Sequence, residues 1–423
     1  MNLPSFLSRR SLRPRRARRA ATLGSVIVAA AVVSCNDDDN NFCCAPTFNV
    51  PNSVAIADVN GDGIPDLLVA TTISQGQQLN PGFANVILNS KSSPGTFSTG
   101  VRYPTSGWNP SSIAVADLTA SGSMDMVVAN IAGSVSVYLH GATPGTFNAA
   151  INYQTGGAPN QVVLADVNGD GKPDIVLADL SRSGNVILLE QDANHPGQFL
   201  APVMLPTGVS TASVAVQDLN GDRAADIVAT GYDNNGNNGA VYVFYQVAAH
   251  PGTFAAAVSF PAGAGPQSVK IADMNADGLP DLVVANFGPG TDGTGIAGVS
   301  VLLQDGARPG SFLAPVSYPT QPASIDVAVA DLDGDGKPDV VVASLGPAPT
   351  GSISVLLQDP ARPGTLLTAT SYAGFGQPLG VAIGDLNKDK LPDIAAADGS
   401  SATVMLQIPG KPGQFSPAVQ VGQ

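Results

Sequence analysis

The sequence has few of the residues from which cross-links and catalytic sites are usually built. Its 423 residues include three cysteines, three histidines, one tryptophan and a single glutamate, Glu190. The cysteines, Cys35, Cys43 and Cys44, all lie near the N-terminus, so the rest of the chain has no disulfide framework. The adjacent pair Cys43 and Cys44 can form a strained vicinal disulfide, pair between chains or stay free.

The same scarcity argues against catalysis. A single glutamate excludes a glycosidase that uses two glutamates, and no Gly-x-Ser-x-Gly, P-loop or His-Glu-x-x-His motif occurs. His195 and His250 each precede a proline, and His140 has a comparable place, so all three are predicted to be turn residues. The sequence therefore predicts that the chain is not an enzyme; a hydrolase that uses a pair of aspartates is the alternative.

Charge is sparse and unevenly distributed. Charged residues make up 12% of the chain, and the formal net charge is −14. Seven arginines and no acid occur in residues 1–34, so the remainder is more acidic still and has no basic stripe that could bind nucleic acid. All acids except Glu190 are aspartates. Short carboxylates of one kind are typical of turns or of sites for a hard cation.

The N-terminus is typical of an exported protein. The arginine-rich start is followed by an apolar run, Ala20–Ser34, that is too short to span a membrane, so residues 1–34 are predicted to be a signal peptide. The run ends Val32-Val33-Ser34-Cys35, which resembles a bacterial lipobox and implies lipidation at Cys35. The alternative is an ordinary signal peptide that happens to contain a cysteine. A twin-arginine export signal around Arg9 and Arg10 is a further alternative to the general route.

Two markers repeat along the rest of the chain. Seven nine-residue segments begin with aspartate, and a Pro-Gly pair follows each of them. We call the segments the Asp loops, first to seventh: they are Asp58–Asp66, Asp117–Asp125, Asp166–Asp174, Asp218–Asp226, Asp273–Asp281, Asp331–Asp339 and Asp385–Asp393. Successive Asp loops begin 49 to 59 residues apart. Repeats of about this length are typical of propellers and arrays.

Each repeat is predicted to hold four strands. In the first, an alternating strand leads into the Asp loop, the apolar run Asp66–Ala70 follows, and a third strand precedes Pro94-Gly95 and a fourth strand. The segment Thr71–Asn85 is predicted to be a long loop, and no stretch shows sustained helical periodicity. The sequence therefore predicts an all-β, seven-bladed β-propeller of four-stranded antiparallel blades over residues 51–423, closed by packing between blades, with residues 35–50 as a polar tether.

The Asp loops predict calcium. The sixth has aspartate at positions 1, 3, 5 and 9, glycine at position 6, and at position 7 a residue whose backbone carbonyl can serve as a ligand. Several oxygens with three or four negative charges suit a hard cation of flexible coordination. The alternative is seven metal-free hairpins, because Asn-Gly and Asp-Gly pairs also form ordinary turns.

The predicted ligands occupy positions 1, 3, 5, 7 and 9 of six loops. They are Asp58, Asn60, Asp62, Ile64, Asp66, Asp166, Asn168, Asp170, Lys172, Asp174, Asp218, Asn220, Asp222, Ala224, Asp226, Asp273, Asn275, Asp277, Leu279, Asp281, Asp331, Asp333, Asp335, Lys337, Asp339, Asp385, Asn387, Asp389, Leu391 and Asp393. The fourth loop is weakened by Arg223 at the glycine position, and the second, with only Asp117 and Asp125, is expected to be empty or weakly occupied. About five or six calcium ions per chain are expected.

The order of loop, strand and turn in Val299–Val342 resembles the FG-GAP, or VCBS-type, repeats of bacterial surface proteins and is similar to those of the integrin α-chain propeller. The resemblance implies seven blades with calcium in the loops between the first and second strands. It does not imply one function, because such propellers serve adhesion, carbohydrate binding and assembly, and form non-catalytic parts of enzymes.

The leading functional prediction is a calcium-binding recognition or adhesion scaffold, exported across the inner membrane and held at the outer membrane or cell surface by its lipid. A periplasm-facing scaffold or assembly factor is the alternative. In each blade the Asp loop and the Pro-Gly turn lie on one face, the Asp-loop face, and the variable connections lie on the opposite face. A protein or carbohydrate partner is predicted on that opposite face, at Trp108, Tyr232, Phe287 and Phe375.

Overall fold

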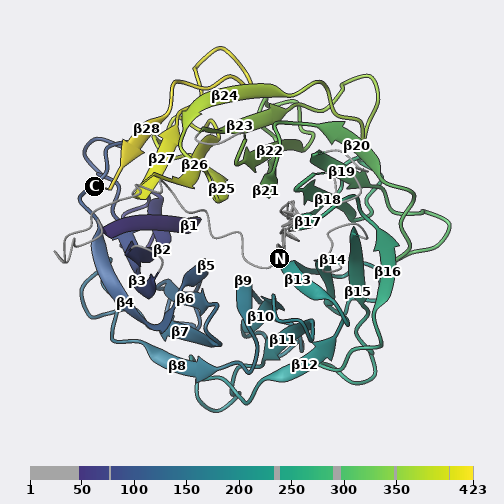
Figure 1. Cartoon of the computed structure of the whole chain (residues 1–423), viewed down its shortest axis with the longest axis horizontal. Helices are drawn as coiled ribbons and strands as arrows, with labels where there is room; N and C mark the ends of the chain where they lie inside the picture. The colour runs from purple at the N-terminus through teal and green to yellow at the C-terminus, as the bar shows by residue number, and fades with distance from the viewer. Residues whose placement is uncertain are drawn as a thin grey trace, which may run out of the picture.

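The computed structural model is a closed ring of seven four-stranded antiparallel sheets (Figure 1). It describes residues 47–75, 78–232, 239–288, 297–346, 350–399 and 401–422. No helix occurs among these residues, so this part of the chain offers none that could cross a membrane. The prediction of an all-β, seven-bladed propeller is confirmed. The predicted signal peptide and Cys35 lie outside the described residues.

The strands follow one another in order, four to a blade. The first four blades comprise β1 (Thr47–Ala57), β2 (Asp66–Gln75), β3 (Gln78–Ile87) and β4 (Val101–Trp108); β5 (Pro110–Ala116), β6 (Asp125–Asn130), β7 (Ser134–Tyr138) and β8 (Ile151–Gln154); β9 (Pro159–Ala165), β10 (Asp174–Asp179), β11 (Asn185–Leu189) and β12 (Val203–Pro206); and β13 (Ser210–Gln217), β14 (Asp226–Tyr232), β15 (Gly239–Phe244) and β16 (Val258–Pro261). The last three comprise β17 (Pro266–Ala272), β18 (Asp281–Asn286), β19 (Gly298–Leu302) and β20 (Val316–Pro319); β21 (Ser324–Ala330), β22 (Asp339–Ser344), β23 (Gly351–Leu356) and β24 (Thr370–Phe375); and β25 (Gly380–Gly384), β26 (Asp393–Asp398), β27 (Ser401–Met405) and β28 (Val419–Val421).

The apolar runs form the second strand of each blade and are buried on both faces. Every residue of β22 is buried, whereas the outermost strand β20 is largely exposed. The side chains of the inner three strands pack against the neighbouring blade. Val341 and Ile353 of the sixth blade, for example, share a cluster with Ile394 and Met405 of the seventh. The core is therefore a ring of seven clusters between blades, which removes both free edges of the blade array.

The aromatic residue that follows most Pro-Gly turns joins neighbouring blades. Phe147 of the second blade packs edge-to-face on Tyr103 of the first, with ring centroids 5.5 Å apart, and its backbone N–H donates to the Tyr103 hydroxyl. The pair Phe415 and Tyr372 repeats this arrangement between the seventh and sixth blades. Edge-to-face packing of this kind adds stability beyond the area it buries.

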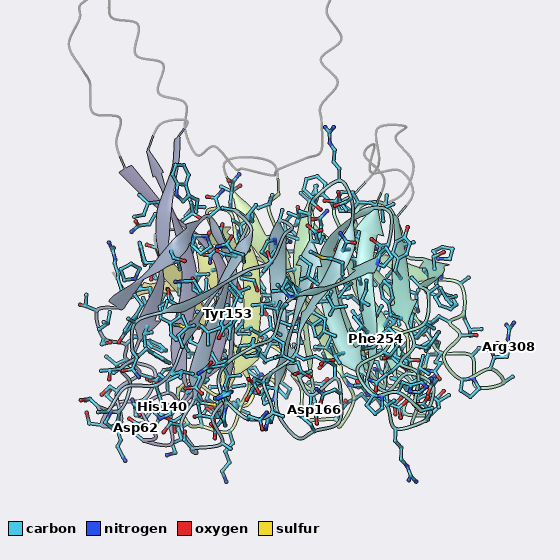
Figure 2. The ribbon with its side chains drawn as sticks, turned by 90° about the horizontal axis from the view of Figure 1, so that it is seen from below. Asp62, His140, Tyr153, Asp166, Phe254 and Arg308 are labelled. Carbon is cyan, nitrogen blue, oxygen red and sulfur yellow. The ribbon has the colours of Figure 1, made fainter. Side chains whose placement is uncertain are left out.

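The first blade is taller than the others. Its strands contain 11, 10, 10 and 8 residues, and they stand out beyond the other blades on the side away from Asp62 and His140 (Figure 2). The structure makes strand of most of Thr71–Asn85, which the sequence analysis predicted to be a loop, because β2 and β3 continue their pairing to Gln75 and Gln78. β1 begins at Thr47, four residues before the boundary placed at residue 51.

In four blades a side-chain amide just after the third strand donates to a carbonyl of the neighbouring blade; these are Asn89, Gln246, Gln304 and Gln407. The amide of Gln304 donates to the carbonyls of Leu219 in the preceding blade and Pro280 in its own, both at 3.0 Å. Asn89 of the first blade donates to Leu386 of the seventh at 2.7 Å and so closes the ring. The ring therefore closes by packing and hydrogen bonds between complete blades, as predicted from the sequence.

Removal of one of these amides should weaken the whole ring. In Gln304→Ala the buried carbonyl of Leu219 and the partly buried carbonyl of Pro280 lose their donor, which should lower the free energy of unfolding by about 1–3 kcal/mol. Chemical denaturation of the variant measures this loss. Gln321→Ala, at an exposed position, is the matched control and should change stability by less than about 0.5 kcal/mol. Equal stability of the two variants would contradict the role assigned to the amide.

Candidate metal centre

All seven Asp loops share one backbone shape, which two left-handed residues produce at positions 4 and 6. In the sixth loop these are Gly334 and Gly336, with φ of 81° and 84°. Glycine adopts this conformation without cost, which explains its recurrence at both positions. The second loop has the same shape with Ala120 and Gly122, although it lacks carboxylates at positions 3 and 5.

The aspartate at position 1 holds this shape. In the sixth loop, Asp331 Oδ1 accepts the backbone N–H of Gly334 at 2.7 Å, and its Oδ2 accepts that of Gly336 at 2.8 Å. In the second loop both oxygens of Asp117 accept backbone N–H groups in the same way. Partial burial alone would raise the pKa of Asp117, but these hydrogen bonds outweigh it and hold the pKa below its usual range.

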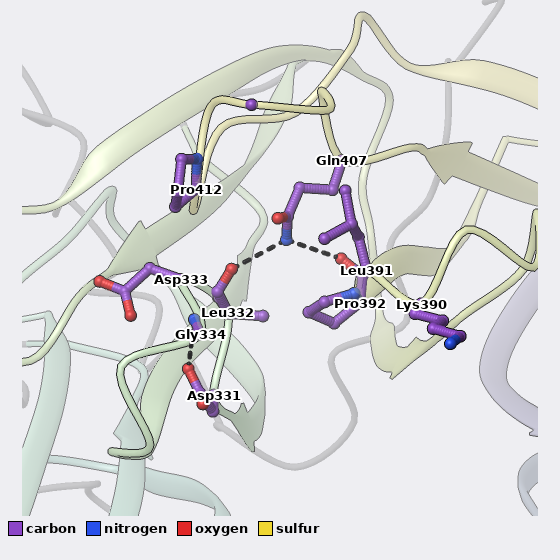
Figure 3. Close-up of a pocket in the computed structure, with 10 residues that line it drawn as sticks. Asp331, Leu332, Asp333, Gly334, Lys390, Leu391, Pro392, Gln407 and Pro412 are labelled. Atoms are coloured by element: carbon purple, nitrogen blue, oxygen red, sulfur yellow. Dashed lines mark hydrogen bonds between the residues drawn. The ribbon is translucent and has the colours of Figure 1, made fainter.

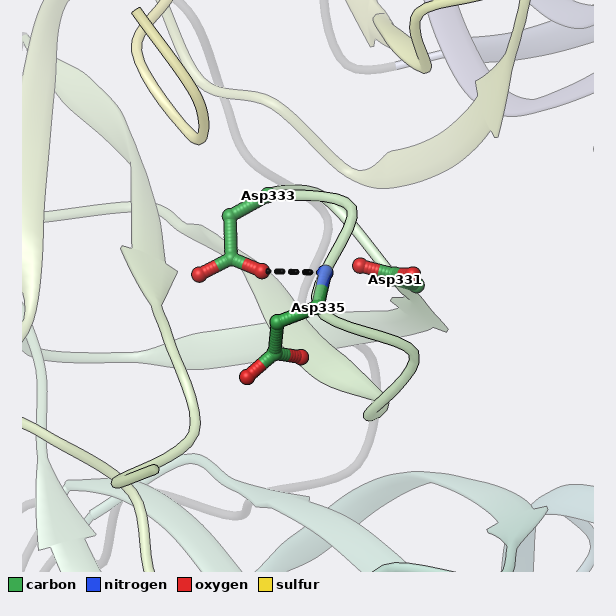
Figure 4. Close-up of side chains that lie close together, drawn as sticks. All are labelled: Asp331, Asp333 and Asp335. Atoms are coloured by element: carbon green, nitrogen blue, oxygen red, sulfur yellow. Dashed lines mark hydrogen bonds between the residues drawn. The ribbon is translucent and has the colours of Figure 1, made fainter. Parts of the chain in front are cut away.

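Three carboxylates converge in the sixth loop. One ligand oxygen each of Asp331, Asp333 and Asp335 lies within 4.8 Å of the other two (Figure 4). Among the described residues this is the one such group of three His, Cys, Asp or Glu side chains. The Lys337 ammonium lies 3.3 Å from Asp335 Oδ2, but it also donates to the Pro360 carbonyl at the edge of the loop. One partly exposed lysine leaves most of the charge of the three carboxylates uncompensated.

The aspartate at position 9 is buried beneath the loop. Asp339 Oδ2 accepts the backbone N–H of Leu332 at 2.9 Å, and its Oδ1 accepts that of Gln358 at 2.7 Å. It is not one of the three converging carboxylates, so its role as a calcium ligand remains a prediction. Its burial raises its pKa to about 6; the two hydrogen bonds oppose this rise, and the charges of Asp333 and Asp335 add to it.

The same environment recurs at position 9 of five other loops. Burial raises the pKa to about 6 at Asp66, Asp174, Asp226, Asp281 and Asp393. These six loops offer several oxygen donors, which calcium prefers and which repel one another in the absence of a cation. They contain no cysteine or histidine, the side chains that typically bind zinc or copper. The residues therefore fit the predicted metal.

The second loop differs in its support as well as in its carboxylates. His140 occupies the place of the interblade amide, and its Nδ1 lies 2.8 Å from Oδ1 of the buried Asp125. His140 lies just after the third strand, as predicted, but its ring also contacts the aspartate at position 9, which was not predicted. His195 does lie in its turn, with Nδ1 2.7 Å from Asp192 Oδ2.

The seventh loop departs from the pattern more than the sequence analysis recognised. Lys388 and Lys390 occupy positions 4 and 6 with φ of 64° and 69°, in the left-handed region that favours glycine. Arg223 of the fourth loop has φ of 72°. Each such residue costs roughly 1 kcal/mol and brings a positive charge close to the loop. The sequence already shows this departure, because lysine occupies positions 4 and 6 of the seventh loop, where the sixth loop has glycine.

Restoring glycine should therefore stabilise the seventh loop. Lys390→Gly should raise the free energy of unfolding by about 1 kcal/mol, because glycine adopts this conformation without strain. Thermal melting of the variant measures the gain. Lys172→Gly, at position 7 of the third loop and outside the set of residues with positive φ, is the control and should lower stability instead. A gain in the control alone would contradict the strain argument.

A cavity of about 230 Å³ lies between the sixth and seventh loops, with Asp331 and Asp333 on one side and Lys390 on the other (Figure 3). Gln407 lines it and donates to the carbonyls of Leu332 and Pro392 at 2.9 and 3.1 Å. The sequence analysis did not identify these amides, although Gln recurs after the third strand in five repeats. The cavity thus lies against the interblade contact that supports both loops.

The four aromatic residues predicted to contact a partner differ in their exposure. Trp108 at the end of β4 is 50% exposed, whereas Tyr232 and Phe375 are 9% and 3% exposed. Phe287 is half-buried. Burial removes Tyr232 and Phe375 as contacts in this conformation; Phe375 packs in the cluster between the sixth and seventh blades.

Solved structures with the same fold include enzymes. A protein described as a 6-phosphogluconolactonase from Bacteroides uniformis matches with a TM-score of 0.54 at 14% identity, over 89% of this chain and 96% of that chain. A periplasmic gluconolactonase from Pseudomonas aeruginosa matches with a TM-score of 0.53 at 17% identity, over 89% and 97%. These likenesses show the fold alone. The prediction that the chain is not an enzyme is therefore corrected: proteins named as lactonases share this fold, so the fold gives no ground for excluding catalysis.

Curated protein sequences gave no match. The FG-GAP-like repeat family matches six overlapping segments: residues 58–128, 117–177, 166–229, 218–284, 273–342 and 331–396. Each match begins at the first aspartate of an Asp loop and runs into the next blade, so it covers the loop and strands described above. The chain belongs to the FG-GAP-like repeat family.

Proposed function

We propose that this chain is a calcium-binding scaffold, anchored in a membrane by lipid at Cys35, that recognises a protein or carbohydrate partner. The observation that carries the calcium part is the convergence of Asp331, Asp333 and Asp335 within 4.8 Å of one another. Like charges at this spacing repel strongly unless a cation or a proton lies between them.

The ions would be held by residues at odd positions of the six richer loops. Every proposed ligand atom is an oxygen, as calcium prefers: side-chain oxygens at positions 1, 3, 5 and 9, and the backbone carbonyl at position 7. When bound, calcium would neutralise the loop carboxylates and join each loop to the start of its second strand. About five or six ions per chain are proposed, because the second loop lacks carboxylates at positions 3 and 5.

Asp333→Asn with Asp335→Asn tests the assignment at one loop. The double variant keeps the side-chain shapes but removes two of three converging charges, so calorimetry should find one calcium ion fewer than in the natural sequence. Thr119→Val with Ser121→Val, at the same positions of the second loop, should leave the stoichiometry unchanged. An unchanged stoichiometry in the first variant would contradict the sixth site.

The anchor and location are proposed from the N-terminal sequence. The lipobox-like Val32-Val33-Ser34-Cys35 supports acylation of Cys35, and hence an outer-membrane or cell-surface lipoprotein; a periplasm-facing scaffold is the alternative. Mass spectrometry of the N-terminal peptide of the membrane-purified protein tests acylation. Protease treatment of intact cells then distinguishes an outward-facing protein, which is cleaved, from a periplasm-facing one, which is protected.

Lactone hydrolysis is a second candidate function, because gluconolactonases are among the solved propellers of this shape. Purified, calcium-saturated protein should be assayed with gluconolactone and its 6-phosphate at neutral pH. Hydrolysis above the rate in buffer, lost on heat denaturation, would support this candidate. A rate equal to that of buffer would leave recognition as the proposed function.

A further inference from the structure

The described chain begins on the face opposite the Asp loops. β1 starts at Thr47 in the tall part of the first blade and runs toward the first Asp loop. Thr47 lies twelve residues after Cys35, and a fully extended segment of that length reaches at most about 40 Å. A lipid on Cys35 therefore holds the point where the chain joins the ring close to the membrane surface.

This reach favours one orientation of the ring. The eleven-residue β1, which begins at Thr47, spans about 36 Å, and the Asp loop adds to the height of the blade. For the Asp-loop face to touch the membrane, the tether would have to pass along the whole wall at nearly full extension. Such a tether has almost no conformational freedom left, so the orientation is disfavoured.

The tall part of the first blade also holds the one tryptophan of the chain. Trp108 pairs with Pro81 of β3, and its carbonyl accepts the backbone N–H of Ala132 in the second blade. The next residue, Asn109, accepts a backbone N–H from Ile131 at 3.0 Å. The backbone of Trp108 is thus fixed from two sides while its side chain remains 50% exposed. Exposed tryptophan held in this way is typical of membrane–water interfaces.

Charge separates the two faces. The Asp loops concentrate carboxylates on one face. Near the opposite face, the described part of the chain has three aspartates: Asp179 and Asp398 are buried, and half-buried Asp326 accepts the backbone N–H of Val381. Arg182, in the connection between β10 and β11, is exposed there. Among the described residues, the opposite face therefore presents no fully exposed aspartate that an anionic bilayer would repel.

We propose that the opposite face rests on the lipid bilayer that carries the anchor, with Trp108 in the headgroup region. This inference depends on the proposed lipidation of Cys35, since one tryptophan and one arginine do not bind a bilayer firmly on their own. The Asp-loop face and the outer strands then face away from the membrane, and a large partner meets these surfaces. The orientation thus revises the predicted partner site, which the sequence analysis placed on the opposite face.

Because Trp108 is the only tryptophan, its fluorescence reports the orientation directly. The full lipoprotein, purified from membranes, is reconstituted on vesicles of phosphatidylethanolamine and phosphatidylglycerol with brominated acyl chains. The emission should shift to shorter wavelength by on the order of 10 nm and lose at least half its intensity relative to unbrominated vesicles, because bromine quenches a ring in the headgroup region. Full exposure to an aqueous quencher, with no effect of bromine, would overturn the proposal.

A reporter on the other face is the control. In Trp108→Phe with Ala307→Trp, the tryptophan moves to an exposed position in the turn between β19 and β20, on the Asp-loop face. Its emission should be insensitive to brominated lipid and quenched by iodide. If bromine quenched this variant but not the natural protein, the ring would lie with its Asp-loop face on the bilayer, opposite to the proposal. Mass spectrometry of the Cys35 peptide separates the two claims: an acylated protein with unquenched Trp108 contradicts only the docking, whereas an unacylated Cys35 contradicts the anchor and the docking together.

Discussion

Chelation of calcium from the purified protein should lower its melting temperature by on the order of 10 °C. A ligand that binds only the folded state stabilises it by RT ln(1 + [L]/Kd), or about 2.7 kcal/mol per site at a hundredfold excess over Kd. Five or six sites in one cooperative ring add up to a large effect, although the contributions of neighbouring loops do not sum fully. Differential scanning calorimetry with and without a chelator measures the shift.

Two controls make this result specific. Added calcium should restore the melting temperature, whereas magnesium should restore much less of it, because magnesium requires a tighter octahedral arrangement of oxygens. Asp331→Asn removes the carboxylate that holds the sixth loop and should reduce the chelator effect as well as the initial stability. A melting temperature that chelation leaves unchanged would be evidence for seven metal-free hairpins.

The calcium-free protein should become less stable as the pH rises from about 4 to about 7. Burial raises the pKa of six aspartates at position 9, among them Asp339, from 3.8 to about 6. A carboxyl group whose pKa is higher in the folded state stabilises the fold while it is protonated. This stability is present below the unfolded pKa and is lost as the pH rises through the folded pKa.

With calcium bound, the dependence should reverse, because calcium binds the ionised carboxylates and competes with protons. The gap between the melting curves with calcium and with chelator should therefore widen as the pH rises. Each buried group contributes on the order of 3 kcal/mol, from about 1.4 kcal/mol per pKa unit over a rise from 3.8 to about 6. In the presence of chelator, Asp339→Asn should reduce the slope of stability against pH by roughly one sixth, because it removes one of six such groups. Parallel curves at all pH values would contradict the coupling between buried carboxylates and calcium.

The fold could be predicted from the sequence because each blade repeats the same local signals. The run Val340–Val342 reads as a strand buried on both faces, and the turn at Pro363-Gly364 marks the approach to the fourth strand. What escaped prediction depends on contacts between blades. Nothing near Gln304 in the sequence indicates that its amide reaches Leu219, a residue 85 positions earlier.

Part of the candidate site was predictable for the same reason. The convergence at Asp331, Asp333 and Asp335 follows from their alternate spacing in a tightly curled loop. The depth of Asp339 beneath them does not, because it depends on backbone N–H groups of Leu332 and of Gln358, which lies 19 residues further along the chain. Nor could the sequence predict that Trp108 is exposed and Phe375 is buried, because both residues lie at variable connections of the same face. Exposure is set by the height of each blade and the path of each connection.

The measurement that tests the account most directly is the calcium content of the purified protein after equilibrium dialysis against calcium at neutral pH. Five or six ions per chain are expected, with the second Asp loop empty or weakly occupied. A content near zero, with the ring still folded, would contradict the central claim that the Asp loops are calcium sites.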